Sequence, residues 1–114
     1  MILEAVMCLA LNVYHEAKNQ SNIGQIAVAQ VVMNRVHDER YPDNVCDVVK
    51  QGLTYKWNRA IPIRNQCQFS WYCDGKSDKP KDKLAWQNAQ MVANGVFYGK
   101  VINLVDGATH YHAY

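Results

Sequence analysis

The sequence predicts a mainly α-helical domain with a short β-hairpin at its C-terminus. Three observations lead to this fold class: apolar residues recur at helical spacing in several segments, an Asp-Gly turn separates two alternating runs near the C-terminus, and 49% of the 114 residues are hydrophobic. A chain of this length buries enough apolar surface for a single core. We therefore expect residues 1–114 to form one domain and to be monomeric.

Four segments are expected to be helical. The first covers residues 3–17, where apolar residues are spaced by three and four: Leu3, Val6, Met7, Ala10, Val13, Tyr14 and Ala17. This spacing is typical of a helix with a wide buried face. The third helix is expected over residues 45–51, with Gly52 as its end, and the fourth over residues 81–94, before Gly95.

The second helix follows a short polar connector, and Ser21 or Asn22 can cap its N-terminus. Its apolar seam consists of Ile26, Ala29, Met33 and Val36. Gln30 and Asn34 are four residues apart and therefore lie on the same side of this helix. Their side chains can reach inward.

The middle of the chain has no clear period. Residues 53–66 mix aromatic and basic residues irregularly and are expected to form a long ordered loop. Residues 67–73, CQFSWYC, are expected to be extended. The lysine-rich stretch 74–83 is expected to be a solvated loop.

The C-terminal residues predict a β-hairpin around Asp106-Gly107, which is a strong two-residue turn signal. In this register Val105 faces Ala108. Alternation then places Ile102, Leu104, Thr109 and Tyr111 on one face, and Asn103, His110 and His112 on the other.

Charge and hydropathy exclude some classes of protein. The balance of 12 Lys and Arg against 10 Asp and Glu, without long runs of one sign, argues against nucleic-acid binding. The apolar N-terminal stretch has Glu4 near its start and no basic leader, so we expect a core helix there and no signal peptide. It is also too short to span a bilayer. We expect synthesis in the cytoplasm, with a site of action that can lie elsewhere.

The four cysteines are Cys8, Cys46, Cys67 and Cys73, and no two of them have the two-residue gap of a zinc or redox motif. Cys8 lies among apolar helix residues and is expected to be a buried thiol. In an oxidising compartment, a disulfide such as Cys46 to Cys67 is conceivable.

Glu16 interrupts the apolar first helix, one turn after Asn12. Partial burial disfavours the ionised form of a carboxyl group, and an acid that stays protonated can donate to a leaving oxygen. The more common alternative is a solvated glutamate at a helix end, because acids are rarely fully buried. Residue patterns alone leave this choice open.

Four blocks of the chain resemble the SleB/CwlJ-like cell wall hydrolases, which occur in spore germination enzymes and phage endolysins. The blocks are LNVYHEAKNQSNIGQIAVAQVVMNRV, YPDNVCDVVKQ, CQFSWYCDG and GATHYHA, in that order. The resemblance implies a lysozyme-like helical domain that cleaves peptidoglycan glycan strands, often as a lytic transglycosylase. It also implies that Glu16, in the family's Y-x-E-A motif, is catalytic. His15 stands where many relatives have glycine, and we expect it to tune Glu16 electrostatically.

The chemistry of glycosidic cleavage is compatible with this resemblance. Glu16 can protonate the departing oxygen, whereas a two-carboxylate hydrolase needs a second acid. Asp47, Asp74 and Asp106 each lie at a helix start, loop or turn, where a structural role explains them equally well. A single acid suits transglycosylation, in which the sugar's own 6-hydroxyl attacks. Because no wall-binding repeat is seen in the sequence, we expect a phage endolysin and not a spore-coat enzyme.

Other blocks suggest contacts with the glycan. Gln68 and Ser70 can bind sugar hydroxyl or acetamido groups, while the rings of Phe69 and Trp71 can either contact a sugar face or belong to the core. The expected hairpin offers further contacts from Thr109, His110 and Tyr111. The basic residues Lys76, Lys79, Lys81 and Lys83 can attract acidic wall peptides, although a solvated loop is the commoner meaning of such a run. No cofactor and no metal are expected.

Two alternatives remain open. A zinc-dependent peptidoglycan amidase or endopeptidase would use His110 and His112, which share a strand face, with a third ligand from His15, His37, Cys73 or an acid. A glycan-binding module without catalysis would not need Glu16 at all.

Overall fold

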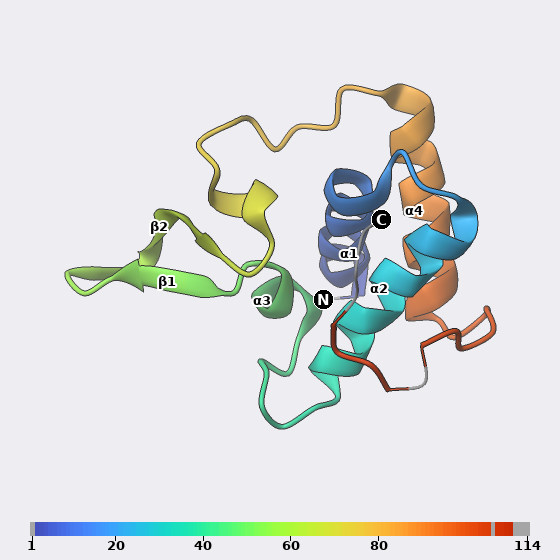
Figure 1. Ribbon diagram of the computed structural model, residues 1–114, viewed down its shortest axis with the longest axis horizontal. Helices are drawn as coiled ribbons and strands as arrows, with labels where there is room; N and C mark the ends of the chain where they lie inside the picture. Colours follow the sequence, from blue (N-terminus) through green and yellow to red (C-terminus); the bar gives the residue numbers. More distant parts are fainter. Residues whose placement is uncertain (1, 106, 111–114) are drawn as a thin grey trace.

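The computed structural model describes residues 2–105 and 107–110 of the chain, and this part is mainly helical (Figure 1). Its elements are α1 (Ile2–Ala17), α2 (Asn22–Val36), α3 (Val45–Val49), β1 (Gly52–Tyr55), β2 (Asn58–Cys67), the 3-10 helix η1 (Ser70–Cys73) and α4 (Lys83–Phe97). The predicted mainly α-helical class is confirmed. None of the described helices is long and apolar enough to cross a membrane.

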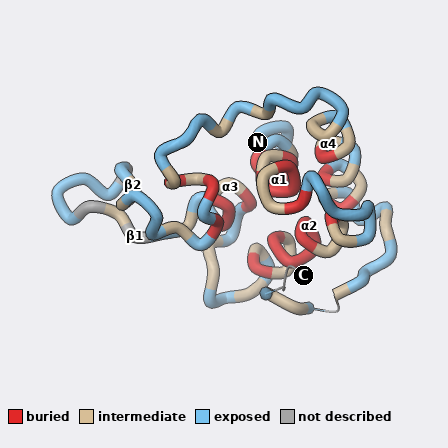
Figure 2. Tube along the Cα trace, turned by 45° about the horizontal axis from the view of Figure 1, so that its top comes forward, coloured by how far each residue is buried: buried red, intermediate tan, exposed pale blue. Residues whose placement is uncertain are grey.

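Helix α1 occupies the centre of the molecule, between α2 and α4 on one side and α3 on the other (Figure 1). Ala10, Val13, Tyr14 and Ala17 are buried on it as predicted, and Leu9 is buried beside them. Leu3 and Met7, which were also predicted for this face, are exposed near the start of the helix. Buried residues of α2, α3 and α4 form one cluster with those of α1, and the buried stretches of the chain lie around α1 (Figure 2). The core therefore forms around the helix that carries Glu16.

The helices begin at side-chain caps. Ser21 Oγ accepts a hydrogen bond from Gly24 N (3.3 Å), which confirms the predicted cap of α2. Asn44 Oδ1 accepts one from Asp47 N at the start of α3. Asp82 Oδ1 accepts one from Ala85 N at the start of α4, so that helix begins at residue 83, two residues later than predicted.

The prediction of a loop over residues 53–66 is wrong, because β1 and β2 form an antiparallel hairpin there. Residues 56–57 connect the strands, and the register shifts twice between the Gly52–Cys67 pair and the turn. The hairpin projects from the helical body (Figures 1 and 2). A strand shows alternating apolar residues when one of its faces is buried in a regular register. This hairpin projects outward and has an irregular register, so its sequence shows no such alternation.

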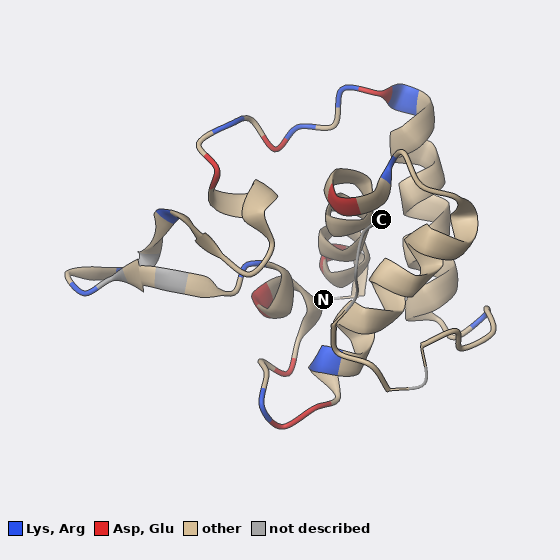
Figure 3. Cartoon of the chain, viewed as in Figure 1, with Lys and Arg blue, Asp and Glu red and all other residues tan. Residues whose placement is uncertain are grey.

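The segment CQFSWYC is not fully extended as predicted, since η1 forms one 3-10 turn within it. The loop 74–82 then leads to α4 and carries alternating basic and acidic residues (Figure 3). Most of its residues are exposed, which agrees with the predicted solvated loop.

The predicted C-terminal hairpin is not present in the described residues, because residues 101–105 and 107–110 are not strands. Side chains of α2 hold this segment instead. Gln30 Nε2 donates to Ile102 O and Gln30 Oε1 accepts from Leu104 N, both at 2.8 Å, and Asn34 Nδ2 donates to Ala108 O at 2.9 Å. These amides reach inward as predicted and satisfy backbone groups that a partner strand would otherwise bind.

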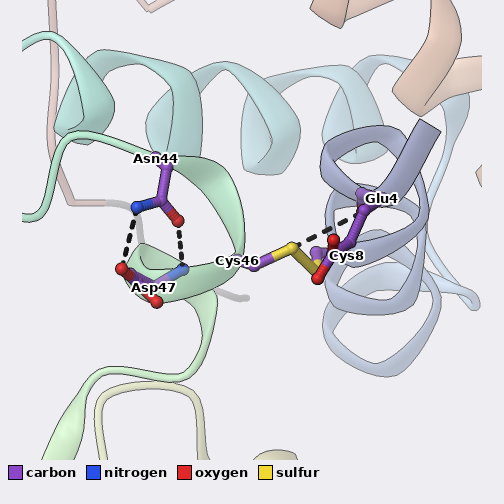
Figure 4. Close-up of a disulfide and its surroundings, with 5 residues drawn as sticks. All are labelled: Glu4, Cys8, Asn44, Cys46 and Asp47. Atoms are coloured by element: carbon purple, nitrogen blue, oxygen red, sulfur yellow. Dashed lines mark hydrogen bonds between the residues drawn. A yellow bond between two sulfur atoms is a disulfide. The ribbon is translucent and has the colours of Figure 1, made fainter. Parts of the chain in front are cut away.

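Two disulfides correct the expectations for the cysteines. Cys8, expected to be a free thiol, is bonded to Cys46, so that α1 is joined to α3 across 38 residues (Figure 4). Cys67 is bonded to Cys73 and not to Cys46, so that the end of β2 is joined to η1. The Cα–Cα distances, 5.2 and 6.2 Å, lie in the usual range for disulfides. The first bond depends on the packing of α3 on α1, which the sequence does not reveal.

Candidate active site

Glu16 lies half-buried in the last turn of α1. One turn earlier, Asn12 is completely buried, and its Oδ1 accepts a hydrogen bond of 2.8 Å from Trp71 Nε1. Residues four apart lie on the same side of a helix, so this bond places η1 beside the helix surface from which Glu16 emerges. Residue patterns left open whether Glu16 is partly buried or fully solvated, and in the structure its side chain is half-buried.

Asn12 has a second feature that the sequence did not reveal. Its Nδ2 is buried and has no hydrogen-bond partner among the residues that the structure describes. A buried amide with a free donor is costly, and such groups are often found at functional sites. The signal that could have identified Asn12 was a polar amide in an otherwise apolar run.

His15 connects the same helix end to two other segments. Its ring stacks on Trp71, with 4.7 Å between centroids and 16° between planes. Its Nε2 donates a 2.8 Å hydrogen bond to the backbone oxygen of Asp78 in the loop 74–82. Burial raises the pKa of the Asp78 carboxyl, while the charge of His15 acts in the opposite direction. His15 therefore holds both η1 and the loop against α1.

Tyr14 provides a second anchor for the loop. Its hydroxyl oxygen accepts hydrogen bonds from the backbone N–H groups of Lys81 and Asp82, each at 3.0 Å. The bond from Asp82 is the main reason that the pKa of Tyr14 is lowered, against the opposing effect of burial. The ammonium group of Lys18 lies 5.0 Å from the centre of the Tyr14 ring.

The predicted contact residues of the QFSW block divide into two groups. Gln68 and Ser70 are exposed, and Gln68 lines a hollow of about 220 Å³ with Gln51, Gly52 and Gln66. Phe69 and Trp71 are 3% and 8% exposed, so both rings belong to the core, which was one of the two alternatives for them. Trp71 can meet a ligand only through its small exposed edge.

Thr109 is attached to the end of α2 and not directly to α1. Its backbone oxygen accepts a 2.7 Å hydrogen bond from Arg35 Nε, and its hydroxyl lies 3.1 Å from Nδ1 of the exposed His110. The guanidinium of Arg35 is buried and lies 5.1 Å from the centre of the Phe69 ring. Arg35, which the sequence interpretation missed, thus links the C-terminal segment to the residues before η1. The predicted contact Tyr111 lies outside the described residues.

The acids considered as a second catalytic group have local roles where they are described. Asp47 accepts a hydrogen bond from Asn44 Nδ2 at the start of α3, and Asp74 Oδ1 accepts one from Lys76 N. Asp106 lies outside the described residues.

The described residues contain no group of three or more His, Cys, Asp or Glu side chains arranged to hold a metal. Cys73, one proposed third ligand, is in a disulfide and has no thiolate to offer. His112 lies outside the described part of the chain. The zinc alternative therefore loses one of its possible third ligands, which leaves His15, His37 or an acid.

Comparison with known proteins identifies the family of this helical domain. The model of the Cell Wall Hydrolase family matches residues 19–114, and the chain belongs to that family. The resemblance seen in the sequence is thereby confirmed. The match begins three residues after Glu16, so it carries no information on the role of that residue.

The spore cortex-lytic enzyme of Halalkalibacterium halodurans is similar to part of the chain. The two are 38% identical over 50 residues, which is 44% of this chain and 15% of the relative. The chain therefore matches only a small share of that relative's length. No solved structure matches the chain.

Proposed function

We propose that the protein cleaves the glycan strands of peptidoglycan and that Glu16 is the general acid. Membership of the Cell Wall Hydrolase family supports the class of substrate. The observation that carries the role of Glu16 is its half-buried position in the last turn of α1, on the side where Asn12 bonds to Trp71 of η1. A carboxyl group shielded in this way can deliver a proton to a glycosidic oxygen.

The proposed reaction is an intramolecular transglycosylation. Glu16 protonates the glycosidic oxygen as the bond from this oxygen to the anomeric carbon breaks, and positive charge develops on the sugar ring. The 6-hydroxyl oxygen of the same sugar then bonds to the anomeric carbon, and Glu16 takes the hydroxyl proton. No water is consumed, and the new chain end is a 1,6-anhydro sugar. This route needs one carboxyl group, and Asp47 and Asp74 are engaged in local hydrogen bonds.

The proposed substrate contacts lie on the two segments that Arg35 links, the one around η1 and the C-terminal one. Gln68 is exposed just before η1 and Ser70 is exposed at its first position, and Thr109 and His110 lie on the segment held by α2. These groups can donate to and accept from sugar hydroxyl and acetamido groups. Tyr111 and the exposed edge of Trp71 complete the proposed set.

The cell envelope is the proposed place of action. The two disulfides support it, because such bonds persist in oxidising compartments outside the reducing cytoplasm. A phage endolysin acts there, and we propose this role for the protein. We also propose that its helices have a lysozyme-like arrangement and that it is a monomer.

The experiment that tests this function measures which bond is cut. Purified peptidoglycan is digested by the protein, and new sugar ends and new free amino groups are counted, with and without EDTA. We expect sugar ends alone and no effect of the chelator. New amino groups that disappear with EDTA would instead establish a metal-dependent amidase or endopeptidase. Binding without any new ends would establish a glycan-binding module.

A further inference from the structure

A basic pocket lies beside the last turn of α1, next to the ring of His15. Its volume is about 340 Å³, and four of its lining residues are lysines: Lys18 at the end of α1, and Lys76, Lys79 and Lys81 of the loop 74–82. The other lining residues are Tyr14, His15 and Ser77. Figure 3 shows the basic residues along this loop. Lysines from two segments of the chain thus converge on one cavity.

Specific contacts assemble this pocket. The hydroxyl of Tyr14 accepts two backbone hydrogen bonds from the loop, and His15 Nε2 bonds to Asp78 O. Lys18 is placed over the Tyr14 ring. The loop is solvated, as predicted, but it is fastened at both Tyr14 and His15, so its exposed lysines are held beside one cavity.

In the described part of the chain, no lysine of the pocket forms an ion pair with an acidic side chain. The ion pair found there joins Arg40 and Asp38. The acids of the loop do not line the cavity. Asp74 accepts from Lys76 N, Asp82 caps α4, and Asp78 is half-buried. The cavity therefore has a surplus of cationic donors, together with the hydroxyl groups of Tyr14 and Ser77, which is the composition of a site for an anion.

We propose that this pocket binds a carboxylate of the peptide stem that the glycan strand carries. The inference rests on the proposed function, because the stem is attached to the strand that Glu16 would cut. Tyr14, His15, Glu16 and Lys18 all belong to, or directly follow, the last turn of α1. An extended peptide spans about 3.3–3.6 Å per residue, so a stem of a few residues can reach around this turn. Lysine ammonium groups then bind its carboxylates by charge-assisted hydrogen bonds.

The test measures binding in the absence of cleavage. The Glu16→Gln protein is used as background, and its dissociation constants for soluble glycan strands are measured with the peptide stems present and after their enzymatic removal. The pocket variant adds Lys18→Gln, Lys76→Gln and Lys79→Gln. The control adds Lys50→Gln, Lys56→Gln and Lys100→Gln, which change the net charge equally at exposed positions that do not line the pocket.

We expect the pocket variant to bind peptide-bearing strands about tenfold more weakly, roughly the effect of one charge-assisted contact, while the control stays near the background protein. On stripped strands all three should bind equally. An equal loss in the control, or the same loss on stripped strands, would overturn the proposal. The proposal would also be overturned if the pocket variant bound more weakly only when phosphate-containing wall polymers are attached to the strands, and if this difference disappeared after hydrofluoric acid had removed those polymers. If Glu16→Gln still cleaves glycan, the proposed role of Glu16 fails. The proposal for the pocket is then still decided by the pocket and control variants, because both share the same residual cleavage.

Discussion

The last turn of α1 has two chemically different sides. On one side, Glu16 is half-buried one turn after the fully buried Asn12, whose oxygen binds Trp71. On the other side, Tyr14 and Lys18 face a solvated loop that is rich in lysine. Proton transfer benefits from limited solvation of the acid, whereas lysines that attract an anion can remain in water. One helical turn thus separates the proposed proton transfer by Glu16 from the proposed anion binding beside Tyr14 and Lys18.

The largest expected effect concerns the acidic side. Glu16→Gln keeps the size of the side chain but removes the transferable proton, so the rate of glycan cleavage should fall by about 100- to 10,000-fold, as is usual for the loss of a general acid. The exposed Glu39→Gln is the matched control and should leave the rate unchanged. A similar melting temperature for both variants would show that the loss is chemical. A Glu16→Gln rate within a factor of ten of the parent would contradict the assignment.

The Cys8–Cys46 disulfide between α1 and α3 should matter more for stability than the Cys67–Cys73 disulfide at η1. Replacing Cys8 and Cys46 by alanine opens a closed loop of 38 residues, and replacing Cys67 and Cys73 opens one of only 6. Chain entropy in the unfolded state predicts losses of about 4 and about 2 kcal/mol, respectively. Chemical denaturation of the two double variants measures both. The reverse order would show that native packing, and not loop closure, dominates.

Asn12→Leu tests how the acidic side is built. The substitution leaves Trp71 Nε1 buried without its acceptor, which should cost about 1–3 kcal/mol of unfolding free energy. The same Asn12→Leu change in a Trp71→Phe background, which has no indole N–H, is the comparison and should cost less. If the leucine variant is as stable as the parent, the Asn12–Trp71 bond does not fix η1 against α1.

Tyr14→Phe tests the basic side. The change removes the acceptor of two backbone N–H groups and should cost about 0.5–1.5 kcal/mol, because these groups are only partly buried and water can replace the hydroxyl. Faster hydrogen exchange at the amides of Lys81 and Asp82 should accompany this loss. Unchanged exchange at both amides would show that the loop is held by other contacts.

The smallest expected effect is that of Asp78→Asn. Because burial raises the pKa of this carboxyl in the folded state, its ionised form lowers stability at neutral pH. This penalty is present above the raised pKa and disappears as the pH falls below the ordinary value for aspartate. The variant should therefore be a few tenths of a kcal/mol more stable at neutral pH, after allowance for solvent screening, and equal to the parent in acid. Melting curves at both pH values decide the sign.

The sequence predicted the positions of the helices well because their apolar residues recur at spacings of three and four. It predicted the buried face of α2 less well: residues 28–32 are all buried, whereas Ile26, Met33 and Val36 of the predicted seam are only partly buried. It also predicted that Gln30 and Asn34 reach inward, although not that they bind the C-terminal segment. The projecting β1–β2 hairpin left no such periodic signal. The cysteine pairing was wrong because it depends on which distant elements meet.

The candidate site likewise has local features that the sequence shows and long-range contacts that it does not. The local context of Glu16, an acid in an apolar helix, is visible in the sequence. The partners of its neighbours are not: Trp71 is 59 residues from Asn12, and Asp78 is 63 residues from His15. Arg35 and the basic pocket likewise arise from long-range packing that has no period along the chain.

The most direct test of the central claim, that Glu16 serves first as acid and then as base, is the mass of the glycan ends formed. Mass spectrometry of digested peptidoglycan should show 1,6-anhydro ends, lighter by one water than reducing ends, which Glu16→Gln fails to form. Reducing ends that incorporate labelled water, or anhydro ends that persist in Glu16→Gln, would contradict the account.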